Sequence, residues 1–162
     1  MGRCAEPDPV AQVAIRYSYA MKISKSDVES LAQFRYALRQ FLRFSERAAR
    51  QAGVSPQQHQ LLMTIKGMPG RSWANVAEIA ERLQVSHHAA VALVTRAQNL
   101  RLVKRAQGKE DRRTVQVSLT AKGEELIGRL AELHQQELGR LAGILLKQLQ
   151  GIAASAKRRQ PA

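Results

Sequence analysis

The sequence predicts a mainly α-helical fold with a small β wing of two or three strands. Apolar residues recur at every third or fourth position over most of the chain, whereas over residues 102–119 they alternate with polar ones. Two short helical segments are separated only by the short break at residues 84–86, which is typical of a helix-turn-helix. A length of 162 residues suits one compact domain with helical extensions.

The N-terminal part predicts a flexible arm followed by a helix. Residues 1–26 show little regular patterning, whereas residues 27–52 carry an apolar stripe at helical spacing. The stripe comprises Leu31, Phe34, Leu38, Phe41, Leu42 and Ser45. A second, basic stripe comprises Arg35, Arg39, Arg43 and Arg47. We interpret the basic stripe as a solvated face that would also accept an acidic partner or ligand.

Capping patterns predict where the next two helices begin within the segment 55–119. Ser55 and Gln58 have the spacing of a capping box, and Gly67 is expected to end the helix that follows. Asn75 and Glu78 repeat the pattern and open a short third helix.

A fourth helix is predicted from Ser86 to about Leu100. Its periodicity predicts that Val91, Val94 and Leu100 face the core.

A β-hairpin follows this helix. Residues 102–106 and 115–119 are the expected strands, and residues 107–113 form a charged loop between them. A basic hairpin directly after a helix-turn-helix predicts a winged helix-turn-helix.

The C-terminal part predicts further helices over residues 120–152 and a basic tail at 153–162. The helical part carries a leucine stripe made of Leu126, Leu130, Leu133, Leu138, Leu141, Leu145 and Leu149. A stripe of that length needs a partner surface. We therefore expect the N-terminal and C-terminal helices of two chains to form a shared dimerisation platform.

The composition favours a polyanionic partner. The chain has 26 Lys and Arg against 13 Asp and Glu, and residues 101–113 alone hold six basic and two acidic groups. No apolar stretch is long enough to span a bilayer, and the N-terminus lacks the apolar region of a secretory signal. The single cysteine, Cys4, cannot form an internal disulfide. We therefore expect a cytoplasmic protein that binds nucleic acid and not a membrane.

Several sequence elements resemble the MarR family of bacterial regulators. They are Ala80-Glu81-Arg82-Leu83, Arg96, Leu102-Val103, Arg105, Asp111-Arg112-Arg113 and Leu119-Thr120 with Gly123. The similarity covers roughly residues 27–150. It implies a homodimeric winged helix-turn-helix transcription regulator, usually a repressor, that binds a palindromic promoter site in duplex DNA. It also implies release by a small aromatic or anionic ligand.

The sequence departs from the family pattern at three positions near the wing. Arg101 stands where the family usually has glycine, Ala97 where it has a large aliphatic residue, and Thr95 where it has an acid. If position 101 is left-handed, arginine costs on the order of 1 kcal/mol there.

Candidate DNA-binding residues lie on the fourth helix and in the wing loop. The helix candidates are Ser86, His87, His88, Ala92, Thr95, Arg96 and Asn99. The wing candidates are Lys109, Asp111, Arg112 and Arg113. Arg96 can bond guanine or phosphate, and Ala92 can contact a thymine methyl. By resemblance, position 92 is often a base-contacting arginine, so alanine there implies a different base preference. By the same resemblance, Arg113 enters the minor groove; Asp111 is spaced to hold it.

The resemblance places a ligand pocket between the dimerisation platform and the winged helix. Its candidate residues are Tyr36, Arg39, His59 and Met63, for which ordinary packing is an equally good interpretation.

The sequence lacks the motifs of an enzyme or a metal site. There is no nucleophile elbow, phosphate loop or dinucleotide fingerprint, and adjacent helical histidines such as His87 and His88 point about 100° apart. We therefore expect no enzyme activity, no metal and no cofactor. Cys4 fits an inert terminal thiol better than a redox switch.

Two other function classes remain open. One is a constitutive or architectural DNA-binding protein that has the same fold and no effector. The other is an RNA-binding or adaptor protein, against which the low aromatic content of 4% argues because bases in single strands stack on aromatic rings.

Overall fold

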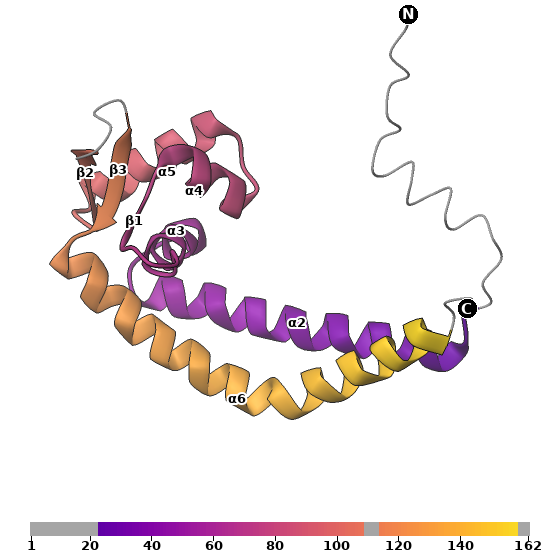
Figure 1. Ribbon diagram of the computed structural model, residues 1–162. Coiled ribbons are helices and arrows are strands. Elements are labelled where there is room, and N and C mark those ends of the chain that lie inside the picture. The colour runs from indigo at the N-terminus through magenta and orange to yellow at the C-terminus, as the bar shows by residue number, and fades with distance from the viewer. Residues whose placement is uncertain (1–22, 109–113, 159–162) are drawn as a thin grey trace, which may run out of the picture. The chain divides into compact units, whose positions relative to one another are not determined.

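The structure is a computed structural model that describes residues 23–108 and 114–158. The chain divides by its contacts into two compact units, one from Arg39 to Leu141 and the other made of the segments before and after it. Helices α2 (Lys25–Gln51) and α6 (Ala121–Arg158) contribute to both units (Figure 1).

The unit from Arg39 to Leu141 holds all the shorter elements. In chain order they are α3 (Pro56–Lys66), β1 (Trp73–Ala74), α4 (Val76–Leu83), α5 (His87–Asn99), β2 (Val103–Gln107) and β3 (Val115–Leu119). The strands form an antiparallel sheet in the order β1-β3-β2, and α5 packs beside β2 (Figure 1). The fold is that of a winged helix, which confirms the predicted fold class.

Reciprocal caps begin two helices where the sequence predicts them. The Ser55 hydroxyl accepts from the Gln58 amide at 3.2 Å, while the Gln58 side chain accepts from the Ser55 amide at 2.9 Å. Asn75 and Glu78 make the same exchange at 2.9 Å in each direction before α4. These bonds satisfy amides that have no partner inside the helix, so the predicted boundaries hold.

The core of this unit is apolar and collects side chains from every element. On α5 it takes Ala90, Leu93, Val94 and Ala97. The prediction that Val91 and Leu100 are core residues was wrong, because their exposed fractions are 38% and 42%. The helix turns a neighbouring face toward the core, and Leu100 stands at the C-cap beyond its last turn.

The first strand of the hairpin is displaced by one residue from its prediction, because β2 begins at Val103 instead of Leu102, whereas β3 has the predicted bounds. Its register pairs Val103 with Leu119 and Gln107 with Val115. Arg101, just before the hairpin, has φ +58°, so arginine stands in the left-handed conformation that favours glycine. Because Arg101 is left-handed, we expect it to destabilise the fold by about 1 kcal/mol relative to glycine.

Helix α6 is one continuous helix that ends at Arg158, so it passes through Ile152 and enters the segment predicted as a tail. Its leucines do not share one environment. Leu126, Leu130 and Leu141 are buried within the chain, whereas Leu133, Leu138 and Leu149 are exposed. The predicted stripe is therefore two sets of side chains, one for the chain's own core and one facing outward.

The second unit pairs the first part of α2 with the last part of α6. The Ser155 hydroxyl donates to an Asp27 carboxylate oxygen. Asp27 also accepts from the Ser24 amide at 3.0 Å, and the Ser24 hydroxyl accepts from the Asp27 amide at 3.2 Å, so the pair caps the start of α2. Large apolar side chains remain exposed on this unit. They are Ile23, Val28, Leu31, Leu38, Ile144, Leu146 and Leu149.

The start of α6 lies against the turn between α5 and β2 without an intervening side chain. The Thr120 amide donates to the Leu102 carbonyl at 3.1 Å, and the Thr120 hydroxyl lies 2.6 Å from the Arg101 carbonyl. A Cβ added at Gly123 would overlap the Leu102 carbonyl oxygen and lie 3.1 Å from its carbon. The Leu-Thr-x-x-Gly element at residues 119–123 is thus a capped helix start that needs glycine for a close backbone approach.

Candidate nucleic-acid interface

Helix α5 presents one long exposed face. Ser86 caps its start by accepting from the Ala89 amide at 3.2 Å, and its four buried residues occupy the opposite side. The structure places every helix candidate on the exposed part of this segment. These residues are Ser86, His87, His88, Ala92, Thr95, Arg96 and Asn99.

All the charged residues in the segment that carries this face are basic. Residues 86–108 contain no Asp or Glu, and all four of their Lys and Arg side chains are exposed. Those side chains are Arg96, Arg101, Lys104 and Arg105. A surface of one sign attracts the phosphate backbone of a nucleic acid, since phosphate contacts supply most of non-specific affinity.

Arg105 of β2 reaches across to α5. Its Nη2 donates to the Thr95 hydroxyl at 2.9 Å and to the Val91 carbonyl at 3.4 Å, and its Nη1 donates to the Gln98 side chain at 3.1 Å. All three acceptors are uncharged, so the guanidinium ties the wing strand to the helix without losing its charge. Periodicity does not reveal this contact, because it joins residues on two different elements.

His87 and His88 lie edge to face, with ring centroids 6.3 Å apart. Within the described residues, no group of three or more His, Cys, Asp and Glu side chains could hold a metal ion. The wing candidates Lys109, Asp111, Arg112 and Arg113 lie outside the described residues, as does Cys4. Gly108 and Thr114, which flank the loop, are joined by a hydrogen bond of 2.8 Å from the Gly108 amide to the Thr114 carbonyl.

The candidate ligand residues fall in different surroundings. Tyr36 is exposed and belongs to the unit that contains the first part of α2. Arg39, His59 and Met63 belong to the winged-helix unit. Arg39 and Met63 are exposed, and only His59 is buried, at 4% exposure. The structure therefore does not show the four residues as one lined pocket.

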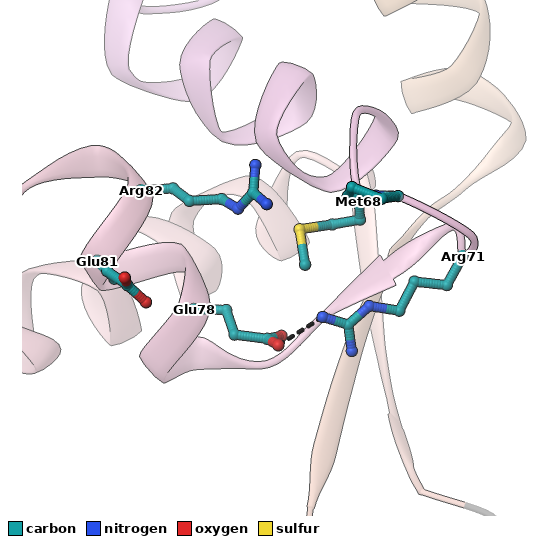
Figure 2. Close-up of a pocket in the computed structure, with 6 residues that line it drawn as sticks. Met68, Arg71, Glu78, Glu81 and Arg82 are labelled. Carbon is teal, nitrogen blue, oxygen red and sulfur yellow. Dashed lines mark hydrogen bonds and ion pairs between the residues drawn. The ribbon is translucent and has the colours of Figure 1, made fainter.

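A pocket of about 380 Å³ lies instead between α4 and the turn before β1 (Figure 2). Arg71 pairs with Glu78 at 2.5 Å and lies 4.2 Å over the Trp73 ring. Burial alone would raise the pKa of Glu78, but the Asn75 amide and the Arg71 guanidinium outweigh it and hold that pKa below its usual value. The pocket also receives Glu81 and Arg82, so its charges balance, and the Arg71–Glu78 pair serves to hold the β1 turn against α4.

His59 stacks on a second buried histidine that sequence patterns did not connect with it. The two rings have centroids 4.6 Å apart. His134 Nδ1 donates to the Leu130 carbonyl at 2.5 Å, and its Nε2 lies 2.8 Å from the Ser45 hydroxyl. Among the described residues, the buried His59 Nε2 has no hydrogen-bond partner. Burial, and then the proximity of His134, lower the pKa of His59 to about 4.

Comparison with known proteins connects this geometry with one family. Residues 52–114 match the MarR family model. The structure resembles that of YusO from Bacillus subtilis, at 26% identity with 86% of this chain and 100% of that chain covered and a TM-score of 0.56. It also resembles AbsC, a MarR family transcriptional regulator from Streptomyces coelicolor, at 19% identity, coverage of 86% and 100%, and a TM-score of 0.63.

A third solved structure is a Staphylococcus aureus MepR mutant bound to an oligodeoxyribonucleotide. It matches at 16% identity, covering 85% of this chain and 96% of that chain, with a TM-score of 0.57. Among curated proteins, none matches this sequence. In the described ranges 23–108 and 114–158, no helix is both long and apolar enough to cross a membrane.

The buried histidine pair makes stability depend on pH. The folded pKa of His59 lies below the ordinary value of 6.5, so the unfolded chain takes up the proton more readily. Its contribution is complete above pH 6.5 and is lost as the pH falls toward 4. We expect the free energy of unfolding in urea to fall by about 2 kcal/mol between pH 6.5 and 5.

The His59→Phe variant, which keeps an aromatic ring and removes the titration, should lose most of this fall. The control His87→Phe, at an exposed histidine, should keep it. An equal fall in the wild type and in His59→Phe would show that His59 does not carry the effect.

Proposed function

We propose, from the match of residues 52–114 to the MarR family model, that this chain is a homodimeric winged-helix repressor that binds a palindromic promoter site in duplex DNA. The observation that carries the proposal is the exposed face of α5 within a segment, residues 86–108, that contains no acidic residue. The N-terminal half of such a helix fits the major groove, where base edges are distinguishable. Proteins of this family are transcription regulators and not enzymes.

Each part of the surface has a role in this proposal. His87 and His88, with Ser86, stand at the start of α5, where recognition helices contact bases. Arg96 and Asn99 lie further along the exposed face and would bond phosphate or base. In the wing, Arg113 would enter the minor groove with Asp111 holding it, while Lys109 and Arg112 contact phosphates.

The dimer would form through α2 and α6. Leu31 and Leu38 on α2, and Ile144, Leu146 and Leu149 on α6, expose large apolar side chains on the same unit. Exposed apolar side chains of this size favour association with a second copy, since their contact with water is unfavourable. A two-fold dimer would also present two copies of α5 to two half-sites.

Release by a small aromatic or anionic ligand completes the proposal. Among the four candidate residues, His59 supports it best, because its buried Nε2 could donate to or accept from a ligand. Titration of the protein–DNA complex with phenolic and carboxylate compounds separates this function from that of a constitutive DNA binder, which would stay bound.

DNA binding should be strongly salt-dependent. With about six to ten phosphate contacts per dimer, affinity for a duplex selected from a random pool should fall about 10³-fold or more between 50 and 200 mM salt. A flat salt dependence measured by fluorescence anisotropy would contradict the proposal.

Arg113→Ala should weaken binding to the selected duplex by roughly 1–3 kcal/mol, whereas the control Arg129→Ala, at an exposed arginine of α6, should change it little.

Dimerisation should depend on the exposed leucines of α6. Leu146 and Leu149 have exposed fractions of 58% and 46%, so aspartate at both positions should leave each chain folded but place charge in the interface. By sedimentation velocity we expect a dimer for the wild type and a monomer for the double variant. The control Lys147→Asp, at an exposed polar position, should remain dimeric. A double variant that sediments as the wild type does would locate the interface elsewhere.

A further inference from the structure

The middle of the exposed face of α5 carries small and apolar side chains, although it lies in a segment, residues 86–108, that has no acidic residue. Val91 has an exposed fraction of 38%, and Ala92 beside it is also exposed. Thr95 is exposed too and stands one turn further along, at the helical spacings of three and four residues from the other two. The three side chains therefore share one surface of the helix.

The hydroxyl of Thr95 is already engaged within the protein. It donates to the Val91 carbonyl at 2.9 Å and accepts from Arg105 Nη2 at 2.9 Å. A hydroxyl has one proton, so Thr95 has none left to donate to a base. What Thr95 offers to a ligand in front of the helix is then its methyl group.

We propose that α5 recognises thymine through its C5-methyl groups, using the apolar surface of Val91, Ala92 and Thr95. This inference rests on the proposed DNA-binding function and adds a base preference to it. In the major groove the thymine methyl is the one apolar feature among the four bases, so apolar side chains there select thymine. Because the Thr95 hydroxyl donates to the Val91 carbonyl, that side chain has no proton left to donate to the acceptors of guanine.

The size of the effect follows from the area of one methyl group. Removing a methyl-sized contact from water contributes about 0.8 kcal/mol, which corresponds to roughly a fourfold change in affinity. Isolated exposed apolar residues are common on protein surfaces, so the arrangement needs a test that responds to thymine methyls alone.

The test uses the full-length protein and a duplex selected from a random pool at one fixed salt concentration. Each thymine in turn is replaced by deoxyuridine, which lacks the methyl group and keeps the hydrogen-bonding pattern. We expect the wild-type affinity to fall roughly fourfold at one or more positions in each half-site. Val91→Ala, which shortens an exposed side chain, should reduce the loss at its position to less than twofold.

Position 95 provides a matched pair of variants. Thr95→Ser keeps the hydroxyl and removes the methyl group, so it should lose the discrimination between thymine and deoxyuridine. Thr95→Val keeps a methyl group at that place and removes the hydroxyl, so it should retain the discrimination. Thermal unfolding of Val91→Ala and Thr95→Ser should match the wild type, because both side chains are exposed and serine keeps the hydroxyl that Arg105 contacts.

The outcomes separate the inference from the function on which it rests. Failure to select any duplex would overturn the proposed function and, with it, the inference. Specific binding with deoxyuridine equal to thymine at every position would overturn the inference alone. A deoxyuridine effect that persists unchanged in both Val91→Ala and Thr95→Ser would also overturn it, since these side chains would then not be the readers.

Discussion

The backbone contact between the first turn of α6 and the Leu102 carbonyl is the constraint on which the winged-helix unit depends. Gly123 permits it, because any side chain there would overlap that carbonyl group. Thr120 reinforces it through its amide and hydroxyl, and the same hydroxyl accepts from the Gly123 amide at 3.1 Å. The end of α5, the start of the hairpin and the start of α6 are thereby held at one point. That point follows the end of α5, the helix whose exposed face is proposed to contact DNA.

This junction explains how an arginine is kept in the left-handed conformation at position 101. The Arg101 amide donates to the Gln98 carbonyl at 2.8 Å, and the Leu102 amide donates to the Ala97 carbonyl at 3.0 Å, so the chain reverses with its backbone groups satisfied. The strained residue allows β2 to run beside α5, which in turn brings Arg105 onto Thr95. The chemistry of the exposed face thus depends on backbone geometry just beyond the C-terminal end of the helix.

Much of the fold could be predicted from the sequence because its signals are local. The Ser55–Gln58 and Asn75–Glu78 caps act within one turn, so their spacing is enough to place α3 and α4. Periodicity was less informative about which face of a helix packs against the core. It identified α5 as a helix but assigned Val91 to the core, because the face that packs inward is decided by neighbours distant in sequence. The stacking of His59 on His134 likewise joins α3 to α6, and no spacing rule connects residues so far apart.

The close approach between α6 and the Leu102 carbonyl requires glycine at position 123. We expect Gly123→Ala to lower the free energy of unfolding in urea by about 1–3 kcal/mol, because the carbonyl of Leu102 belongs to the backbone and has little room to move. Gly128→Ala is the matched comparison in the same helix. No atom of the described part of the chain lies within 4 Å of a Cβ added there, so this change should be neutral or stabilise by up to about 1 kcal/mol. Equal stability changes in the two variants would contradict the claim.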